Sequence, residues 1–231
     1  MDIHKGMLAM TLYHGSDHII EKPAFGLGKV QNDYGLGFYC TEHVELAKEW
    51  ACGELKDGFA NKYEIDLKGL KVIDLNSADY TIVDWLAVLV ANRDVQVTTP
   101  IQIEAKKQLL ERFLPDFSKA DIIRGYRADD SYFSFARAFL GNEISLRQLS
   151  LAMRLGQLGE QVVLKSKKAF GRLRYSGNVL AEAKAYYPKR LARDTAARAA
   201  FKKEASNPDL DGIFMRDILR EHMRRDDARL R

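Results

Sequence analysis

The sequence predicts an α+β fold. Short β-prone stretches such as "AMTLYHGS" (residues 9–16) and "KYEIDL" (62–67) are separated by segments with apolar residues at three- and four-residue spacing, which is typical of amphipathic helices. The strands and helices do not follow the regular order of βαβ units, which disfavours a doubly wound sheet. The 231 residues, 46% of them hydrophobic, suffice for one larger domain or one domain with a substantial appendage.

The strands are predicted from short apolar runs bounded by turn residues. A long loop rich in Gly, Pro, Asn and Asp is expected over residues 18–37, after the first strand. "KVIDL" (71–75) is expected to lie beside "KYEIDL", and the strand in "ADIIRG" is expected to break at Gly125. The remaining predicted strands are "FYCTE" (38–42) and "EQVVLKS" (160–166).

The helices are predicted from their apolar spacing. The first of them, over 42–53, is expected to have Thr41 as its N-cap and to stop at Gly53. Another is expected to begin after Asp129 and Asp130. The other predicted helices cover 79–93, 101–114, 145–159, 167–173 and most of the chain after residue 182.

The charge is unevenly distributed along the chain. Residues 164–231 hold 18 Lys and Arg against 9 Asp and Glu, whereas residues 1–163 hold 18 against 23. This asymmetry predicts a basic appendage on a mildly acidic body. We therefore expect a domain over 10–177 and a basic helical extension over 178–231. The extension is either a solvated face or a surface that recruits RNA or DNA.

Cys40 and Cys52 are the two cysteines of the chain. Two cysteines make no disulfide framework, and no CxxC motif or neighbouring histidine cluster indicates zinc, so no metal is expected. No apolar run reaches the roughly 18 residues of a membrane span, and the start of the chain lacks the features of a secretory signal. We expect a cytoplasmic protein with reduced thiols and no membrane partner.

Two predicted strands end beside glycine with a residue suited to ligand binding. "LYHGSD" (12–17) places His14 before Gly15 and Ser16, and "GLGFYCTE" (35–42) places Tyr39 after two glycines. Glycine lets a backbone approach a ligand closely, histidine supplies a hydrogen-bonding group and tyrosine supplies an aromatic face. The sequence therefore indicates either two turns or a pocket for a flat, phosphate-bearing ligand.

Four motifs carry a family resemblance over roughly residues 10–175. "YHGS", "GLGFYCTE" with the following A-x-x-W-A helix, "IIRGYRADDSY" and "LGEQVVLKSKKAF" occur in this order. Together they resemble an uncharacterised bacterial family in the ADP-ribosyltransferase superfamily, whose diphtheria-toxin-like members carry a His–Tyr–Glu signature. The resemblance implies a split β-sandwich with inserted helices and NAD in a cleft between two small sheets.

The resemblance also implies the residues that bind NAD. His14 would bind the adenosine ribose hydroxyls, the Gly15 backbone would hold the nicotinamide carboxamide, and Tyr39 would lie against the nicotinamide ring. Ser16 belongs to the same cofactor-binding group. Breaking the nicotinamide–ribose bond creates an oxocarbenium-like centre, as in glycoside hydrolysis, so oxygens near the developing cation are required.

The chain departs from the signature where the superfamily has its catalytic glutamate. The corresponding strand begins Glu160-Gln161. Adjacent strand residues face opposite sides, so one of the two faces the cleft, and the apolar residues that follow do not decide which. If Glu160 faces it, the signature is complete. If Gln161 faces it, as the resemblance favours, the site has a neutral amide instead.

The motif "YRADD" offers a compensation for a neutral amide. Arg127 is a candidate for binding a pyrophosphate. Asp129 or Asp130 would supply the missing negative charge, and we take Asp130 as the candidate catalytic residue. The alternative interpretation is that one of these aspartates caps the following helix.

The resemblance implies an NAD-dependent mono-ADP-ribosyltransferase that acts on protein, RNA or DNA. Proteins of this kind often act as toxins, in toxin–antitoxin or phage-defence systems, so an antitoxin is a possible partner. Two alternatives stay open: a catalytically silent nucleotide-binding module, and a basic nucleic-acid-binding protein whose N-terminal fold is structural.

Overall fold

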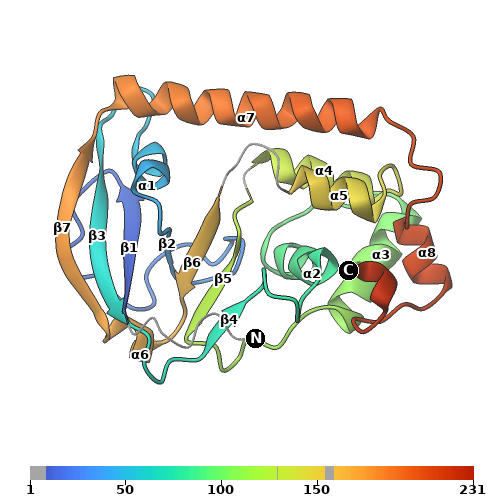
Figure 1. Ribbon diagram of the computed structural model, residues 1–231, viewed down its shortest axis with the longest axis horizontal. Helices are drawn as coiled ribbons and strands as arrows, with labels where there is room; N and C mark the ends of the chain where they lie inside the picture. Colours follow the sequence, from blue (N-terminus) through green and yellow to red (C-terminus); the bar gives the residue numbers. More distant parts are fainter. Residues whose placement is uncertain (1–8, 129, 154–158) are drawn as a thin grey trace.

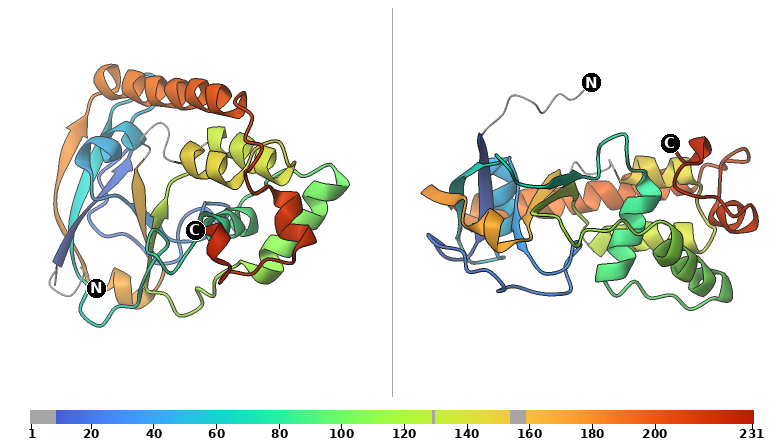
Figure 2. Two further views of the ribbon diagram at one scale, coloured as in Figure 1. Left: turned by 45° about the vertical axis from the view of Figure 1, so that its right-hand side comes forward. Right: turned by 90° about the horizontal axis from the view of Figure 1, so that it is seen from below.

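Two β-sheets lie next to each other, and a set of helices packs against the second sheet (Figure 1). The computed structural model describes residues 9–128, 130–153 and 159–231. The described residues form both β-sheet and α-helix, with two sheets and eight α-helices, in agreement with the predicted α+β class. In both views of Figure 2 the sheets occupy one end of the molecule and α2, α3 and α8 occupy the other.

The first sheet is antiparallel and has the strand order β1-β3-β7. Its strands are β1 (Ala9–Ser16), β3 (Gly58–Asp66) and β7 (Leu173–Ala181). The sequence did not predict β7, because it is an edge strand with mostly exposed side chains and lacks the apolar alternation of a half-buried strand. The predicted domain boundary after residue 177 falls inside this strand.

The second sheet has the strand order β2-β6-β5-β4. Its strands are β2 (Phe38–Cys40), β6 (Glu160–Leu164), β5 (Ile122–Tyr126) and β4 (Val72–Asp74). The expectation that 71–75 lies beside 62–67 was wrong, because β4 pairs in parallel with β5 of the other sheet. The expected break at Gly125 was also wrong, since β5 continues to Tyr126.

Gly125 has a packing role in β5. A Cβ at this position would lie 2.3 Å from the hydroxyl oxygen of Tyr34. That hydroxyl donates to the Tyr126 carbonyl at 2.7 Å and accepts from the indole N–H of Trp85 at 2.9 Å. The glycine therefore allows the loop before β2 to approach β5 closely, and it does not terminate the strand.

A short bridge joins the two sheets. The Tyr13 N–H donates to the Thr41 carbonyl at 2.7 Å, and the Thr41 N–H donates to the Tyr13 carbonyl at 2.9 Å. Beyond this bridge β1 and β2 separate. A small core of apolar residues fills the space beside the bridge, including Leu12, Cys40, Ile65 and Val162.

The helices follow the predicted segments closely. Capping boxes at Thr81 with Asp84, at Thr99 with Gln102 and at Ser145 with Gln148 satisfy the first free N–H groups of three of them. Thr41 is not the N-cap of the first helix, because that position is taken by His43. The helices are α1 (Val44–Ala51), α2 (Ile82–Asn92), α3 (Pro100–Arg112), α4 (Asp130–Leu140), α5 (Leu146–Ala152), α6 (Lys167–Phe170), α7 (Ala183–Ala205) and α8 (Met215–Arg220).

The C-terminal extension is integrated into the rest of the structure. The long helix α7 crosses α1 and the α4–α5 pair along one side of the molecule (Figure 1). Beyond it, Met215, Ile218, Met223 and Leu230 are buried in the same apolar cluster as α2 and α3. Arg225 Nε lies 2.7 Å from Asp84 Oδ1, which links the last residues to the start of α2. Removal of the extension would therefore expose part of the core.

None of the helices in the described part of the chain has the length and apolar character required to cross a bilayer.

Candidate functional site

A cleft of about 730 Å³ opens where β1 and β2 separate. This volume is in the range of small-molecule sites, about 300–1,000 Å³. Its walls come from β1, β2, α1, β6, the segment after β5, the loop over residues 17–37 and α7. Five of the predicted site residues line it: His14, Gly15, Tyr39, Arg127 and Gln161.

His14 links β1 to β2 through its side chain. Its Nδ1 lies 2.7 Å from the Tyr39 carbonyl oxygen, and its ring stacks on Phe38 at a centroid distance of 4.4 Å. Burial lowers the pKa of His14. The hydrogen bond with the Tyr39 carbonyl raises it, but burial has the larger effect. A neutral imidazole that donates from Nδ1 to a carbonyl has Nε2 as an acceptor. His14 is thus set up to accept a hydrogen bond from a ligand hydroxyl.

Gly15 presents its backbone along the edge of β1. The N–H and C=O of Tyr13 point toward β2, and residues two apart in a strand point their backbone groups to the same side. The N–H and C=O of Gly15 therefore face the edge of the sheet at the cleft. A Cβ here would lie 2.1 Å from the Ala47 carbonyl oxygen. Glycine is required because α1 packs directly on the strand at this point.

Ser16 does not line the cleft. Its hydroxyl donates to the His18 carbonyl at 2.5 Å and accepts from the Asn61 side chain at 2.9 Å. Asn61 is fully buried, and its Oδ1 accepts from the Ile20 N–H at 2.9 Å. Ser16 and Asn61 together fix the point where the 17–37 loop leaves β1, so the structure places Ser16 in a supporting position.

Tyr39 is held by the end of the same loop. Its hydroxyl donates to the Gly35 carbonyl at 2.5 Å and accepts from the Tyr34 N–H at 3.1 Å. Lys165 Nζ donates to the carbonyls of Tyr34 and Leu36, both at 2.5 Å. The ring of Tyr39 is therefore part of a fixed wall, and the loop that supports it is anchored at both ends.

Gln161, rather than Glu160, faces the cleft. Gln161 is only 4% exposed, and its Nε2 donates to Asp33 Oδ2 at 2.6 Å and to the Tyr126 carbonyl at 3.3 Å. Glu160 is directed to the other face of the sheet, where its Oε2 accepts from Arg124 Nε at 2.6 Å. Arg124 also pairs with Glu42. The neutral amide of Gln161, and not the carboxylate of Glu160, therefore lines the cleft.

Arg127 lies over the ring of Trp50, 4.7 Å from its centroid, and both residues line the cleft. Trp50 comes from α1, in the A-x-x-W-A segment, and its buried Nε1 has no hydrogen-bond partner among the described residues. Asp130 is the first residue of α4, but its side chain lies outside the described residues, as does the whole of Asp129. Neither aspartate is assigned a contact.

Four charged residues of the cleft, Lys22 among them, were not found from the sequence. Asp33 comes from the 17–37 loop, Arg93 follows α2, and Arg190 projects from α7. Asp33 is the single acidic side chain among the described residues that line the cleft, whereas Lys22, Arg93, Arg127 and Arg190 supply positive charge. A loop carboxylate has no periodic signal, and only the packing of the loop onto β5 and β6 brings it to the site.

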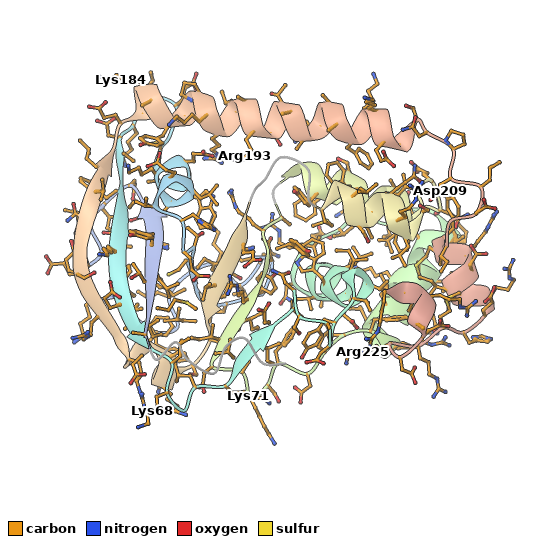
Figure 3. All side chains as sticks on the ribbon, in the orientation of Figure 1. Lys68, Lys71, Lys184, Arg193, Asp209 and Arg225 are labelled. Carbon is orange, nitrogen blue, oxygen red and sulfur yellow. The ribbon has the colours of Figure 1, made fainter. Side chains whose placement is uncertain are left out.

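The contribution of Arg190 depends on how α7 attaches. Arg193 forms a bidentate ion pair with Glu49 of α1, with Nε–Oε2 and Nη2–Oε1 distances of 3.0 and 2.8 Å. Glu49 is buried, and Arg193 is on the inner side of α7, facing α1 (Figure 3). This pair holds the helix against the wall of the cleft that carries β1.

Within residues 9–128, 130–153 and 159–231, no group of three or more His, Cys, Asp or Glu side chains is positioned to hold a metal ion. Cys40 and Cys52 are buried free thiols outside the cleft lining. The polar groups that remain are suited to an organic ligand with hydroxyl, amide and anionic parts.

A protein-family model matches residues 10–175, which is most of the chain and includes every predicted site residue. Its description is "Protein of unknown function (DUF3990)". The chain matches no curated protein and no solved structure.

Proposed function

The chain belongs to the DUF3990 family of proteins of unknown function, and from the residues of its cleft we propose that it binds NAD and transfers ADP-ribose from it to a macromolecule. The fold proposed with this activity is the split β-sandwich of the ADP-ribosyltransferases. The observation that carries the proposal is that His14 and Gly15 from one sheet and Tyr39 and Gln161 from the other line the same cleft.

The polar groups of the cleft match the parts of NAD. A carboxamide has one donor and one acceptor side, which pair with the C=O and N–H of a single edge residue such as Gly15. The acceptor Nε2 of His14 suits a ribose hydroxyl. The rings of Tyr39 and Trp50 offer aromatic surface for a flat base. Arg127 and Arg190 offer the positive charge that a diphosphate requires.

The reaction would begin with cleavage of the bond between nicotinamide and ribose. The electron pair of that bond leaves with nicotinamide, and positive charge develops on the ribose. The Gln161 side chain has its nitrogen occupied by Asp33 and Tyr126, which leaves the amide oxygen to orient a ribose hydroxyl. A positioned acceptor of this kind contributes by favouring the transition-state geometry.

A second candidate function is a catalytically silent NAD-binding module. The neutral amide of Gln161 favours it, because an amide stabilises a developing cation less well than a carboxylate. The two candidates differ in one measurable product, which is free nicotinamide. A protein that binds NAD and releases no nicotinamide would support the silent module.

The proposed acceptor is a protein, RNA or DNA. The basic character of the extension favours a polyanionic acceptor, since residues 178–231 hold 13 Lys and Arg against 9 Asp and Glu. The proposed biological role is that of a bacterial toxin or phage-defence effector, with an antitoxin as a possible partner.

The test uses the full-length protein and NAD labelled in the adenylate part. NAD binding is measured by calorimetry, nicotinamide release by chromatography, and label transfer after incubation with whole-cell extract treated with protease, RNase or DNase. We expect binding, release and incorporation of label into one class of macromolecule. Absence of NAD binding would contradict the proposal, and binding without release would leave the silent module.

A further inference from the structure

Asp33 occupies an unusual position for a loop carboxylate. It is only 6% exposed, although it comes from the 17–37 loop, and it lines the cleft. Its Oδ2 accepts two hydrogen bonds, from Gln161 Nε2 at 2.6 Å and from the Ala128 N–H at 2.9 Å. Its buried Oδ1 has no hydrogen-bond partner among the described residues, and Arg93 Nη1 lies 3.7 Å away.

The two oxygens of this carboxylate therefore differ: Oδ2 is hydrogen-bonded within the protein, whereas Oδ1 has only the longer ion pair with Arg93. Oδ2 fixes the segment after β5 and orients Gln161. Burial of Oδ1 without a hydrogen bond is unfavourable, and the Arg93 ion pair at 3.7 Å offsets it only in part, so a ligand group that bonds to Oδ1 would be favoured. Such orphaned groups in a ligand cleft are candidates for binding or catalysis.

We propose that Asp33 is the catalytic carboxylate of this cleft and that it supplies the negative charge which Gln161 lacks. The inference rests on the proposed NAD-cleaving function. Asp33 Oδ1 stabilises the developing ribose cation, and it then acts as the base for the attacking acceptor. Gln161 orients the ribose, so that the two residues divide between them the tasks of a single glutamate.

The step balances for hydrolysis and for transfer. The bond between ribose C1′ and the nicotinamide nitrogen breaks, and its electron pair leaves with neutral nicotinamide. A bond forms between C1′ and an oxygen of water or of an acceptor hydroxyl. The proton of that hydroxyl passes to Asp33 Oδ1 and afterwards to solvent. No oxidant, reductant or metal ion is required.

The surroundings of Asp33 suit a base that changes its protonation state. Burial raises the pKa of Asp33, while the hydrogen bonds from Ala128 and Gln161 and the charges of Arg93 and Arg127 lower it. Among the described residues, the hydroxyls of Tyr34 and Tyr39 also lie near Asp33, and both have a pKa raised by burial. A carboxyl group with a raised pKa is a better proton acceptor than an ordinary surface aspartate.

The substitution Asp33→Asn tests the proposed role of Oδ1 while keeping the hydrogen bonds that Oδ2 accepts. The side-chain oxygen of asparagine takes the position of Oδ2 and still accepts from Gln161 and Ala128. The NH₂ group takes the position of Oδ1, so the variant loses the ion pair with Arg93 but no hydrogen bond among the described residues. The matched control is Asp94→Asn, at an exposed aspartate that follows Arg93 and does not line the cleft.

The experiment measures NAD dissociation constants and nicotinamide release between pH 4 and 9 for the wild type and both variants. We expect Asp33→Asn to bind NAD within about threefold of the wild type and to release nicotinamide about 100- to 1000-fold more slowly. We also expect the wild-type rate to fall at acidic pH as Asp33 becomes protonated, and this decline to be absent in Asp33→Asn. Asp94→Asn should match the wild type.

Three results would overturn the inference. If Asp33→Asn keeps the wild-type rate and acidic decline while the wild type cleaves NAD, Asp33 is not catalytic and the proposed function stands. If Asp33→Asn loses NAD binding, the carboxylate has a binding or structural role. If the wild type itself binds no NAD, or binds it and releases no nicotinamide, the proposed transferase function fails and the inference fails with it.

Discussion

The wall of the cleft formed by β1 and the wall formed by β6 with the 17–37 loop carry different kinds of polar group. On the β1 wall, burial lowers the pKa of His14, whose Nδ1 bonds to a carbonyl, and Gly15 offers only backbone groups. On the β6 wall, Gln161, Asp33 and Arg127 come together, and Asp33 has a raised pKa because it is buried. Fixed groups that contact the bound ligand and the transition state equally contribute to affinity. A buried carboxylate with a shifted pKa is instead a candidate for stabilising charge in the transition state.

The comparison therefore predicts that the two walls of the cleft have different roles, one in binding and one in catalysis. Substitutions on the β1 wall should change NAD affinity, and substitutions on the β6 wall should change turnover. The β1 wall also depends on α7, because the Arg193–Glu49 pair fastens that helix to α1. The predictions below test each part of this division.

The largest effect is expected for Gln161→Ala. Loss of the group that orients the ribose should reduce nicotinamide release about 100- to 1000-fold, which corresponds to about 3–4 kcal/mol. Glu160→Ala is the matched control, because Glu160 pairs with Arg124 on the opposite face of the strand and should keep most of the activity. A large loss in Glu160→Ala with little loss in Gln161→Ala would reverse the roles assigned to Glu160 and Gln161.

Arg193→Ala should destabilise the protein by about 2–3 kcal/mol, because it leaves the buried Glu49 carboxylate unpaired. The free energy of unfolding is measured by urea denaturation. Arg198→Ala serves as the control, since Arg198 makes a more exposed ion pair with Asp194 within α7, and it should change stability by less than about 0.5 kcal/mol. Equal stability of both variants would show that α7 does not depend on this pair.

His14→Ala should weaken NAD binding about tenfold while the rate from the bound complex changes little, since one hydrogen bond to a ligand hydroxyl contributes about 1–1.5 kcal/mol. Calorimetry gives the affinity and single-turnover release gives the rate. His43→Ala is the control, because His43 is exposed at the start of α1 and does not line the cleft. Unchanged affinity in a folded His14→Ala protein would remove His14 from the site.

The smallest effect is expected in the stability of Asp33→Asn. Because the pKa of Asp33 is raised in the folded state, the unfolded chain ionises first as the pH increases. The wild type thus loses stability from about pH 4, near the ordinary aspartate pKa, up to the raised value in the folded protein. Asp33→Asn has no such loss, so its free energy of unfolding should rise relative to that of the wild type across this window. A constant difference between pH 3 and 8 would contradict the raised pKa.

Much of the local structure was predictable from the sequence because it follows from periodicity. The strands β1, β2, β3 and β6 and the helices α1 to α3 lie where apolar spacing and turn residues indicated. The edge strand β7 was missed because its exposed residues carry no apolar pattern. The predicted pairing of β4 with β3 was wrong. Strands that follow each other in the chain often pair, but β4 pairs with β5, which comes two helices later in the chain.

The sequence by itself determined the α+β class, the helical C-terminal extension and four candidate residues that line the cleft, His14, Gly15, Tyr39 and Arg127. These depend on local patterns, such as glycine beside His14 and Tyr39, that require no knowledge of distant contacts. Only the tertiary structure decided that Gln161 faces the cleft, that Ser16 supports a loop and that Arg190 reaches the site from α7. It alone brought Asp33 to Gln161, because a buried contact across 128 positions of the chain arises from packing and leaves no mark in the neighbouring sequence.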